Sequence, residues 1–164
     1  IASKKQSENQ DSEASRITHS NRQKFWAEFI EYNRQHNGLY RDSSDTSGEG
    51  LSKNVKGLAG TKIYVLIYKN HTRTEVYINH SDKDKNKRLF DYLYTHKKEI
   101  EQQFGGELTW QRLDDRNASR IRIDRDDLSY LKPEQQEEIF KFFIDTSNRL
   151  MKAFAPYAKK YNGQ

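Results

Sequence analysis

The sequence predicts an α+β domain in which a mainly antiparallel sheet of four to five strands, built as two hairpins, packs against three helices. Two observations predict this class. Apolar residues recur at helical spacing in three segments, whereas short runs rich in β-branched and aromatic residues alternate between them. Short polar turns join these runs, and such turns connect antiparallel neighbours. The expected order is helix, two or three strands, helix, two strands, helix, with the order of strands in the sheet left open.

The first helix is expected over about residues 20–35, with Ser20 or Asn21 as its cap and Gly38 as its stop. Its apolar face consists of Phe25, Trp26, Phe29, Ile30 and Tyr32. These residues recur at the spacing of one helix face, which predicts that the helix buries them against the rest of the domain.

The first strands follow a polar loop over residues 41–50. Residues 51–55 alternate weakly and predict a short edge strand. Residues 61–68 are apolar or aromatic on both faces, which predicts a central strand. After a turn over 70–72, residues 74–79 predict the returning strand of the first hairpin.

The second helix is expected over about residues 84–104 and ends at the glycine pair 105–106. Two further strands, over 108–113 and 119–124, form the second hairpin. Pro133 suits the first turn of a third helix, which we expect to end near Pro156.

The domain boundaries follow from composition. Residues 1–19 are polar and serine-rich and predict a linker or disordered tail that follows a preceding domain. Residues 20–158 predict a single domain, and residues 159–164 a C-terminal tail. The chain has no cysteine and no apolar run of the ~20 residues that cross a bilayer, so we expect a cytoplasmic protein without membrane contact. Its net charge of +5 is a modest basic excess that favours nucleic acid only if the charges cluster.

Several short stretches stand out in order along the chain. They are 25–29 (FWAEF), 75–78 (EVYI), 89–91 (LFD), 98–101 (KEIE), 110–113 (WQRL), 118–121 (ASRI) and 154–156 (FAP). Together they resemble a prokaryotic family still classed as a domain of unknown function, over about residues 22–158. Members of that family occur alone or after an N-terminal nuclease-like domain, often of the restriction-endonuclease-like kind. The resemblance implies a setting in restriction, defence or DNA processing, and it carries over no catalytic residue.

The second hairpin carries the first candidate nucleic-acid site, which consists of Arg112, Arg120, Arg122 and Arg125. Arg120 and Arg122 alternate along one strand and therefore point to the same face of the sheet. The planar fork of an arginine suits phosphate. Two alternatives stay open: pairing with nearby acidic residues, which are Glu107, Asp114, Asp115 and Asp124, or an ion-pair network of Arg112 and Arg120 with helix carboxylates.

The entry to the second helix carries a second basic cluster, in which Lys83, Lys87 and Arg88 are the candidate nucleic-acid-binding residues. Cations at a helix N-terminus oppose the helix dipole, which hints at a use such as contact with phosphate. The alternative is an ordinary charged helix entry, since Asp82, Asp84 and Asp91 dilute the cluster.

Three tyrosines, Tyr64, Tyr68 and Tyr77, lie on the first hairpin and could form a platform that stacks bases. The alternative is that they pack beneath a helix. The five histidines lack the spacing of a metal site, and no phosphate-binding loop is present, so we expect no metal and no cofactor.

A diverged Mg²⁺-dependent nuclease is the enzymatic alternative. It would use Glu75 and a carboxylate of the loop 42–49, but Tyr77 stands where such nucleases place a lysine. The leading hypothesis is therefore a non-catalytic accessory module of a DNA-processing or defence protein. It would bind DNA or dock a preceding nuclease-like domain, and a purely protein-binding module is the third possibility.

Overall fold

The structure is a computed structural model that describes residues 2–161, with side chains described for residue 10 and residues 12–161. The chain divides into two compact units, residues 1–51 and 52–164. Each unit is described by itself below. The assignment of residues 20–158 to a single domain stays a prediction.

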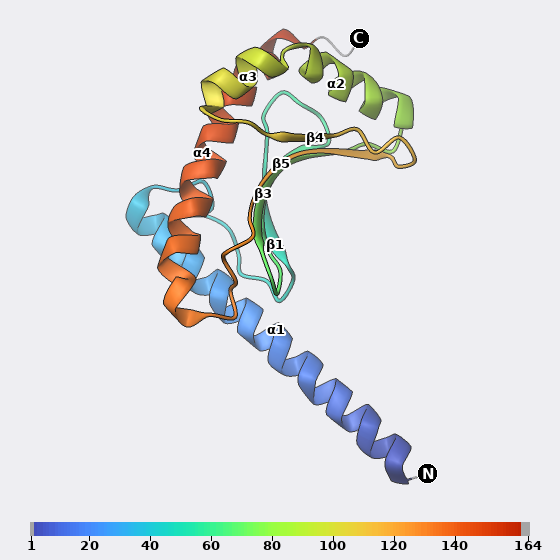
Figure 1. The fold of residues 1–164 in the computed structure, drawn as a ribbon, viewed down its shortest axis with the longest axis vertical. Coiled ribbons are helices and arrows are strands. Elements are labelled where there is room, and N and C mark those ends of the chain that lie inside the picture. Colours follow the sequence, from blue (N-terminus) through green and yellow to red (C-terminus); the bar gives the residue numbers. More distant parts are fainter. Residues whose placement is uncertain (1, 162–164) are drawn as a thin grey trace. The chain divides into compact units, whose positions relative to one another are not determined.

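The first unit is dominated by helix α1 (Ala2–His36), drawn in blue in Figure 1. The expected start near Ser20 is wrong, because the helix begins at Ala2 and includes residues 2–19, which we assigned to a linker or disordered tail. The physical reason is that this segment is polar yet contains no glycine or proline. It is rich in alanine, glutamate, glutamine and lysine, which favour a helix.

The apolar face of α1 is buried as predicted, except that Tyr32 is only half-buried. The rings of Phe25 and Trp26 meet edge to face with their centroids 5.0 Å apart. The indole Nε1 of Trp26 donates to the carbonyl oxygen of Gly48 at 3.0 Å, which ties the polar loop to the helix.

The end of α1 depends on a buried asparagine. Asn33 donates from Nδ2 to the carbonyl oxygen of Phe29 at 2.7 Å, and its Oδ1 accepts from the amide of Tyr40 at 3.2 Å. Asn37 has a φ of 53°, and the amide of Gly38 donates back to the carbonyl oxygen of Asn33 at 2.8 Å. This left-handed turn is the usual way to end a helix.

The second unit is built on a five-stranded sheet of order β1-β2-β3-β5-β4. The strands are β1 (Gly50–Asn54), β2 (Thr61–Ile67), β3 (Thr72–Asn79), β4 (Thr109–Gln111) and β5 (Ala118–Arg125). The pairs β2–β3, β3–β5 and β4–β5 are antiparallel, which confirms the predicted α+β class and both hairpins. The long strands β3 and β5 lie side by side and join the hairpins into one sheet (Figure 1).

The segment expected to form one helix over 84–104 forms two, α2 (Lys83–Thr95) and α3 (Lys97–Phe104). The prediction failed at His96, whose φ of −106° and ψ of 17° leave the helical region. The break redirects the chain so that Leu93 and Ile100 can both be fully buried.

A single turn of 3₁₀ helix (Pro133–Gln135) leads into α4 (Gln136–Lys160), so Pro133 does start the last helix. The expected end near Pro156 is wrong. A proline removes one backbone donor, and α4 continues past it because Ala153, Phe154 and Ala158 are buried on either side. The predicted tail therefore starts inside α4, and residues 162–164 lie outside the described residues.

The core of the second unit lies between the sheet and its helices. Ile63, Val76, Ile78 and Ile121 of the sheet pack there against apolar residues of α2, α3 and α4. Beneath α4, Thr146 Oγ1 lies 2.7 Å from Thr74 Oγ1 in a buried hydrogen bond. In Figure 1, α2, α3 and α4 lie on one side of β3 and β5. The other face of the sheet carries no helix of residues 52–160.

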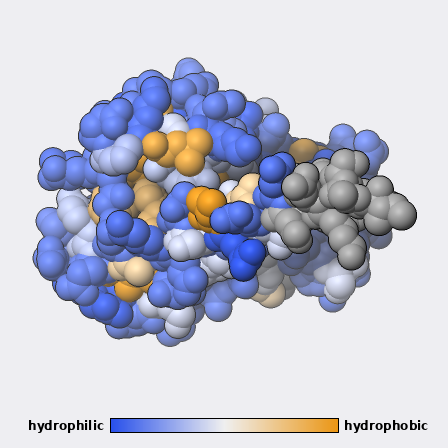
Figure 2. All heavy atoms as spheres, turned by 90° about the horizontal axis from the view of Figure 1, so that it is seen from below, coloured by the Kyte–Doolittle hydropathy of each residue, from blue (hydrophilic) through white to orange (hydrophobic). Residues whose placement is uncertain are grey.

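The surface is mainly hydrophilic. Figure 2 shows a face on which blue side chains predominate and hydrophobic residues form small separate groups. Large exposed hydrophobic residues among the described ones are Ile17, Tyr94 and Leu131. The low hydrophobic content of 33% is therefore concentrated in the interior.

Candidate functional site

The face of the sheet opposite the helices carries a cluster of charged and aromatic side chains, which we call the arginine face. It consists of Tyr64, Arg73, Glu75, Tyr77, Arg120, Arg122 and Asp124. Strand alternation places all of them opposite the buried isoleucines and valines. The pairing of β3 with β5 then sets one residue of each strand beside one of the other.

The register of β3 and β5 brings acids and bases together. Arg73 lies opposite Asp124, and Glu75 lies opposite Arg122. Arg73 Nε donates to Asp124 Oδ1 at 2.7 Å, and Arg122 Nη1 donates to Asp124 Oδ2. Arg122 also donates from Nε to Gln111 Oε1 at 3.0 Å. The predicted alternative that pairs an arginine with Asp124 is thus present.

The second carboxylate is bound less completely. Glu75 is 4% exposed, and its Oε2 lies 3.6 Å from Nε of Arg120. Neither of these two buried atoms has a hydrogen-bond partner among the described residues. Burial raises the pKa of Glu75, and the positive charges of Arg120 and Arg73 act in the opposite direction.

Three tyrosine rings lie beside the charged side chains of this region. Tyr64 and Tyr77 meet edge to face with their centroids 5.7 Å apart. The guanidinium of Arg120 lies 5.7 Å from the centre of the Tyr77 ring, and that of Arg73 lies 5.6 Å from the centre of Tyr68. Tyr64 and Tyr77 are half-buried on the face opposite the core that packs against α2 to α4.

The arginine face has a positive local field, since three arginines face two carboxylates. Burial lowers the pKa of Arg122, and the neighbouring charges of Arg73 and Arg120 lower it further. The pKa of His71, next to the face on the β2–β3 turn, is also lowered, first by burial and then by Arg73. In both cases burial is the largest cause, the neighbouring arginines add to it, and Asp126 acts in the opposite direction.

Arg112 lies outside the arginine face. Its guanidinium forms a bidentate pair with Asp91 of α2, at 2.9 and 3.0 Å, and also donates to Asp114 at 2.5 Å. The hydrogen bond from Arg112 lowers the pKa of Asp114. This is the helix-carboxylate pairing that the sequence left open for Arg112.

Lys83, Arg88 and Arg112 line an open hollow of about 430 Å³ beside α2. The hollow is also lined by Asp84, Asp91 and Asp114, so its positive charge is largely offset. Lys83 and Arg88 are exposed. They therefore form a mixed charged surface rather than a concentrated basic patch.

Lys87 is buried in the fold, although it lies in a charged segment of the sequence. The side chain is buried, with only 6% of the residue exposed. Its Nζ donates to the carbonyl oxygens of Arg112, Leu113 and Ala118 at 2.5, 2.7 and 2.8 Å. Burial lowers its pKa. Because these bonds occupy the ammonium group, Lys87 is not presented to a nucleic acid at the surface.

Asn86 completes the attachment of α2 to the second hairpin. Its Nδ2 donates to the carbonyl oxygens of Ile78 and Asn117 at 2.8 and 3.0 Å, and its Oδ1 lies 2.7 Å from Ser119 Oγ. The start of α2 is thereby joined to both β3 and β5. Sequence reasoning missed this role, because a buried asparagine inside a polar helix entry gives no periodic signal.

Arg125 is held at the end of β5. It donates to both carboxylate oxygens of Asp127 at 2.7 Å and to Glu138 of α4 at 2.8 Å. These bonds join the strand to the helix. Sequence reasoning also missed Arg73, although its alternation with Glu75 and Tyr77 along β3 was a usable signal.

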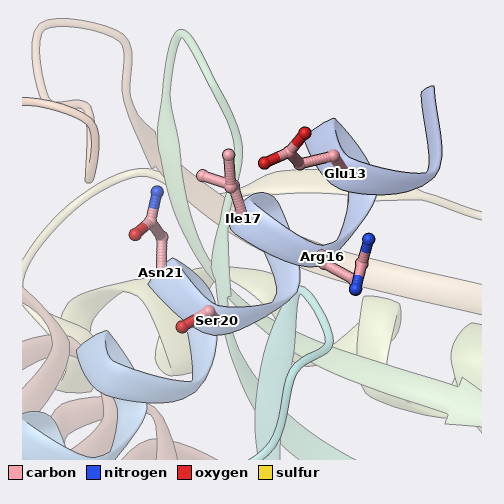
Figure 3. A pocket seen from close by; sticks show the side chains of 5 residues that line it. All are labelled: Glu13, Arg16, Ile17, Ser20 and Asn21. Carbon is pink, nitrogen blue, oxygen red and sulfur yellow. The ribbon is translucent and has the colours of Figure 1, made fainter. Parts of the chain in front are cut away.

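Elsewhere, the hollow on α1 does not bring reactive or ligand-binding side chains together. A shallow hollow on α1 is lined by Glu13, Arg16, Ile17, Ser20 and Asn21. Figure 3 shows these five side chains spread along a single helix. The described residues contain no group of three or more histidines and carboxylates that could hold a metal ion. No described helix is both long and apolar enough to cross a membrane.

Comparison with known proteins gives one match. No curated protein and no solved structure matches this chain. A family model, described as a domain of unknown function (DUF4268), matches residues 21–158 and thus most of the chain. The match covers the second half of α1, the sheet and α2 to α4. The chain therefore belongs to the DUF4268 family.

Proposed function

We propose that this chain is a non-catalytic accessory module of a DNA-processing or defence protein of the restriction type, and that it binds nucleic acid through the arginine face. A prokaryotic, cytoplasmic setting and a nuclease-like partner domain are part of this proposal. The observation that carries it is the row of three arginines and two tyrosines on a sheet face without a helix of its own unit.

The arginines suit phosphate even though they are paired. Arg73 and Arg122 share one carboxylate, Asp124, so the five donors of each guanidinium exceed the acceptors around them. A phosphate group can take up the remaining donors in bidentate fashion. The surplus positive charge would draw a polyanion to this face.

The tyrosines favour binding of single-stranded over double-stranded nucleic acid. Tyr64 and Tyr77 lie on the same face as the arginines, and aromatic rings on a sheet surface can stack unpaired bases. A duplex hides its base faces and would meet only the charges. We therefore expect single strands to bind more tightly than duplexes of the same length.

The other predicted basic residues have unequal parts in this proposal. Lys83 and Arg88 are exposed and would add phosphate contacts beside α2. Lys87 and Arg125 are engaged in the fold, and Arg112 is paired with two aspartates.

A salt titration of the whole chain tests the proposal. Fluorescence anisotropy with a labelled thymidine 12-mer and with a 12-base-pair duplex is expected to show micromolar binding that weakens steeply with added salt. The Arg120→Glu and Arg122→Glu variants are expected to bind about tenfold more weakly or worse, with a shallower salt dependence. If a charge reversal unfolds the sheet, Arg122→Gln serves instead, because it removes the positive charge without introducing a negative one and is also expected to weaken binding.

The matched control is Lys152→Glu, which changes the same charge on the exposed surface of α4. It is expected to have a much smaller effect than Arg122→Glu. Unchanged affinity in folded Arg120 and Arg122 variants would exclude the arginine face as the binding surface. No salt-sensitive binding to any probe would overturn the nucleic-acid function and favour docking of a partner domain.

A further inference from the structure

Glu75 and Arg120 leave a hydrogen-bond acceptor and a donor unused at the centre of the arginine face. Glu75 Oε2 and Arg120 Nε lie 3.6 Å apart, and neither has a hydrogen-bond partner in the described part of the chain. Buried polar atoms are nearly always paired, because an unpaired one loses its hydrogen bonds to water without replacement. Such a pair of adjacent atoms is a candidate for recognition of a ligand.

The residues around Glu75 and Arg120 indicate what kind of ligand the pair can bind. Tyr64 lies directly opposite Glu75 on β2, and Tyr77 lies directly opposite Arg120. The two rings meet edge to face beside the pair, and Arg122 lies opposite Glu75 on the other strand. A planar group with its own donors and an acceptor along one edge would stack on a ring and satisfy both unused atoms. A nucleobase has this shape.

We propose that Glu75 and Arg120 recognise the Watson–Crick edge of an unpaired guanine. This inference rests on the proposed function, because it assigns a base preference to the same nucleic-acid surface. The Arg120 Nε would donate to the guanine O6, and the Glu75 carboxylate would accept from N1–H and from the 2-amino group.

The donor and acceptor pattern separates guanine from the other bases. The pair presents one donor followed by two carboxylate acceptors, and the guanine edge presents one acceptor followed by two donors. Cytosine and adenine each offer a ring nitrogen that can accept from Arg120 and an amino group that can donate to Glu75, so each makes one contact fewer than guanine. Thymine and uracil set an acceptor against the carboxylate.

Asp124, the other carboxylate of the arginine face, differs from Glu75 in its hydrogen bonds. Its two oxygens already accept from Arg73 and Arg122, so it has less capacity left for a base. Because Glu75 and the Nε atom of Arg120 are buried, a base can reach both only if the half-buried Arg120 side chain rotates. We expect the 3.6 Å contact between them to open when guanine binds.

The experiment measures binding of the whole chain to labelled thymidine 12-mers in which one central position is guanine, adenine, cytosine or hypoxanthine. The guanine probe is expected to bind about tenfold more tightly than the adenine and cytosine probes, as is usual for a bidentate base contact. Hypoxanthine lacks the 2-amino group, makes one contact fewer than guanine and is therefore expected to bind about as weakly as adenine.

Two variants locate the preference. Glu75→Gln puts an amide donor in place of an acceptor, so the guanine preference is expected to fall to about twofold or less while salt-sensitive binding persists. Glu134→Gln makes the same substitution at an exposed position outside the arginine face and is expected to keep the preference. The comparison of guanine with hypoxanthine needs no variant and is independent of any effect on folding.

The outcomes separate the two proposals. Salt-sensitive binding with equal affinity for guanine and hypoxanthine would overturn the base recognition and leave the proposed function standing. A guanine preference that survives in folded Glu75→Gln would also overturn it. No binding to any 12-mer would overturn the proposed function and this inference with it.

Discussion

The ammonium group of Lys87 on α2 lies 2.8 Å from the carbonyl oxygen of Ala118, the first residue of β5. The same group donates to the carbonyl oxygens of Arg112 and Leu113, at the other end of the β4–β5 turn. One buried lysine thus holds both sides of the turn that leads into β5. Since β5 carries Arg120 and Arg122, Lys87 supports the arginine face from the opposite side of the sheet.

Replacement of Lys87 by methionine is expected to destabilise the protein by about 1–3 kcal/mol, because the carbonyl oxygens of Arg112, Leu113 and Ala118 lose a charged donor. Two of them keep another donor, since Ser119 Oγ donates to the Arg112 oxygen and the Arg116 amide donates to the Leu113 oxygen. Urea unfolding followed by circular dichroism measures this change. Lys85→Met is the matched control, since Lys85 is exposed on the same turn of α2. Equal stability of the two variants would show that the Lys87 bonds are not important to the fold.

Replacement of Gly60 by alanine is expected to destabilise the protein by more than about 2 kcal/mol. Gly60 has a φ of +69°, and an added Cβ would lie 2.4 Å from the backbone oxygen of Asn79, which is held in the sheet. Gly106→Ala is the control, because the nearest atoms to its Cβ are 3.9 Å away, on Phe104. Thermal unfolding of both variants tests the difference, and a near-neutral Gly60→Ala would contradict it.

The stability of the protein is expected to depend on the protonation of Glu75. Its folded-state pKa is raised above the ordinary value of 4.5, chiefly by burial. The folded state therefore binds this proton more tightly than the unfolded state does, and the associated stability is full below pH 4.5 and is lost as the pH rises through the folded pKa. Glu75→Gln keeps a neutral side chain, so its stability relative to the wild type is expected to increase with pH.

Urea unfolding of the wild type and of Glu75→Gln at several pH values from 4 upward measures this dependence. The groups facing Glu75 are Tyr64 on β2, Arg73 and Tyr77 on β3, and the β5 arginines Arg120 and Arg122. A stability difference that does not change with pH, or that falls as the pH rises, would contradict the raised pKa.

Arg112→Ala is expected to change stability little, because its partners Asp91 and Asp114 are exposed and water screens such pairs. Nucleic-acid affinity is also expected to change less than in Arg122→Glu, since Arg112 lies outside the arginine face. Anisotropy titrations of both variants at the same salt concentration compare them. An equal or larger loss in Arg112→Ala would move the binding surface to the hollow beside α2.

Much of the secondary structure could be predicted from local pattern. The five strands match the expected segments to within two residues at each end, because their alternation records which side chains are buried. The helix ends were less predictable. The break at His96 and the continuation of α4 through Pro156 both follow from tertiary burial, which no local signal reports.

The candidate site was predictable only in part. Alternation placed Arg120 and Arg122 on one face, and the structure agrees. Lys87 looked like part of an exposed basic entry to α2, yet it is buried against a hairpin some 25 residues further on. A lysine can be buried when several carbonyl oxygens surround its ammonium group, and only the fold can supply them.

The sequence by itself determined the α+β class, the positions of the strands and the faces of Arg120 and Arg122, because each depends on a periodicity of two or 3.6 residues. The tertiary structure decided which strands are neighbours. By pairing β3 with β5 it set Glu75 and Arg73 among the β5 arginines and placed Glu75 Oε2 3.6 Å from Arg120 Nε, where neither atom finds a hydrogen-bond partner among the described residues. Strand order depends on contacts between residues about 45 positions apart, and no local pattern encodes such contacts.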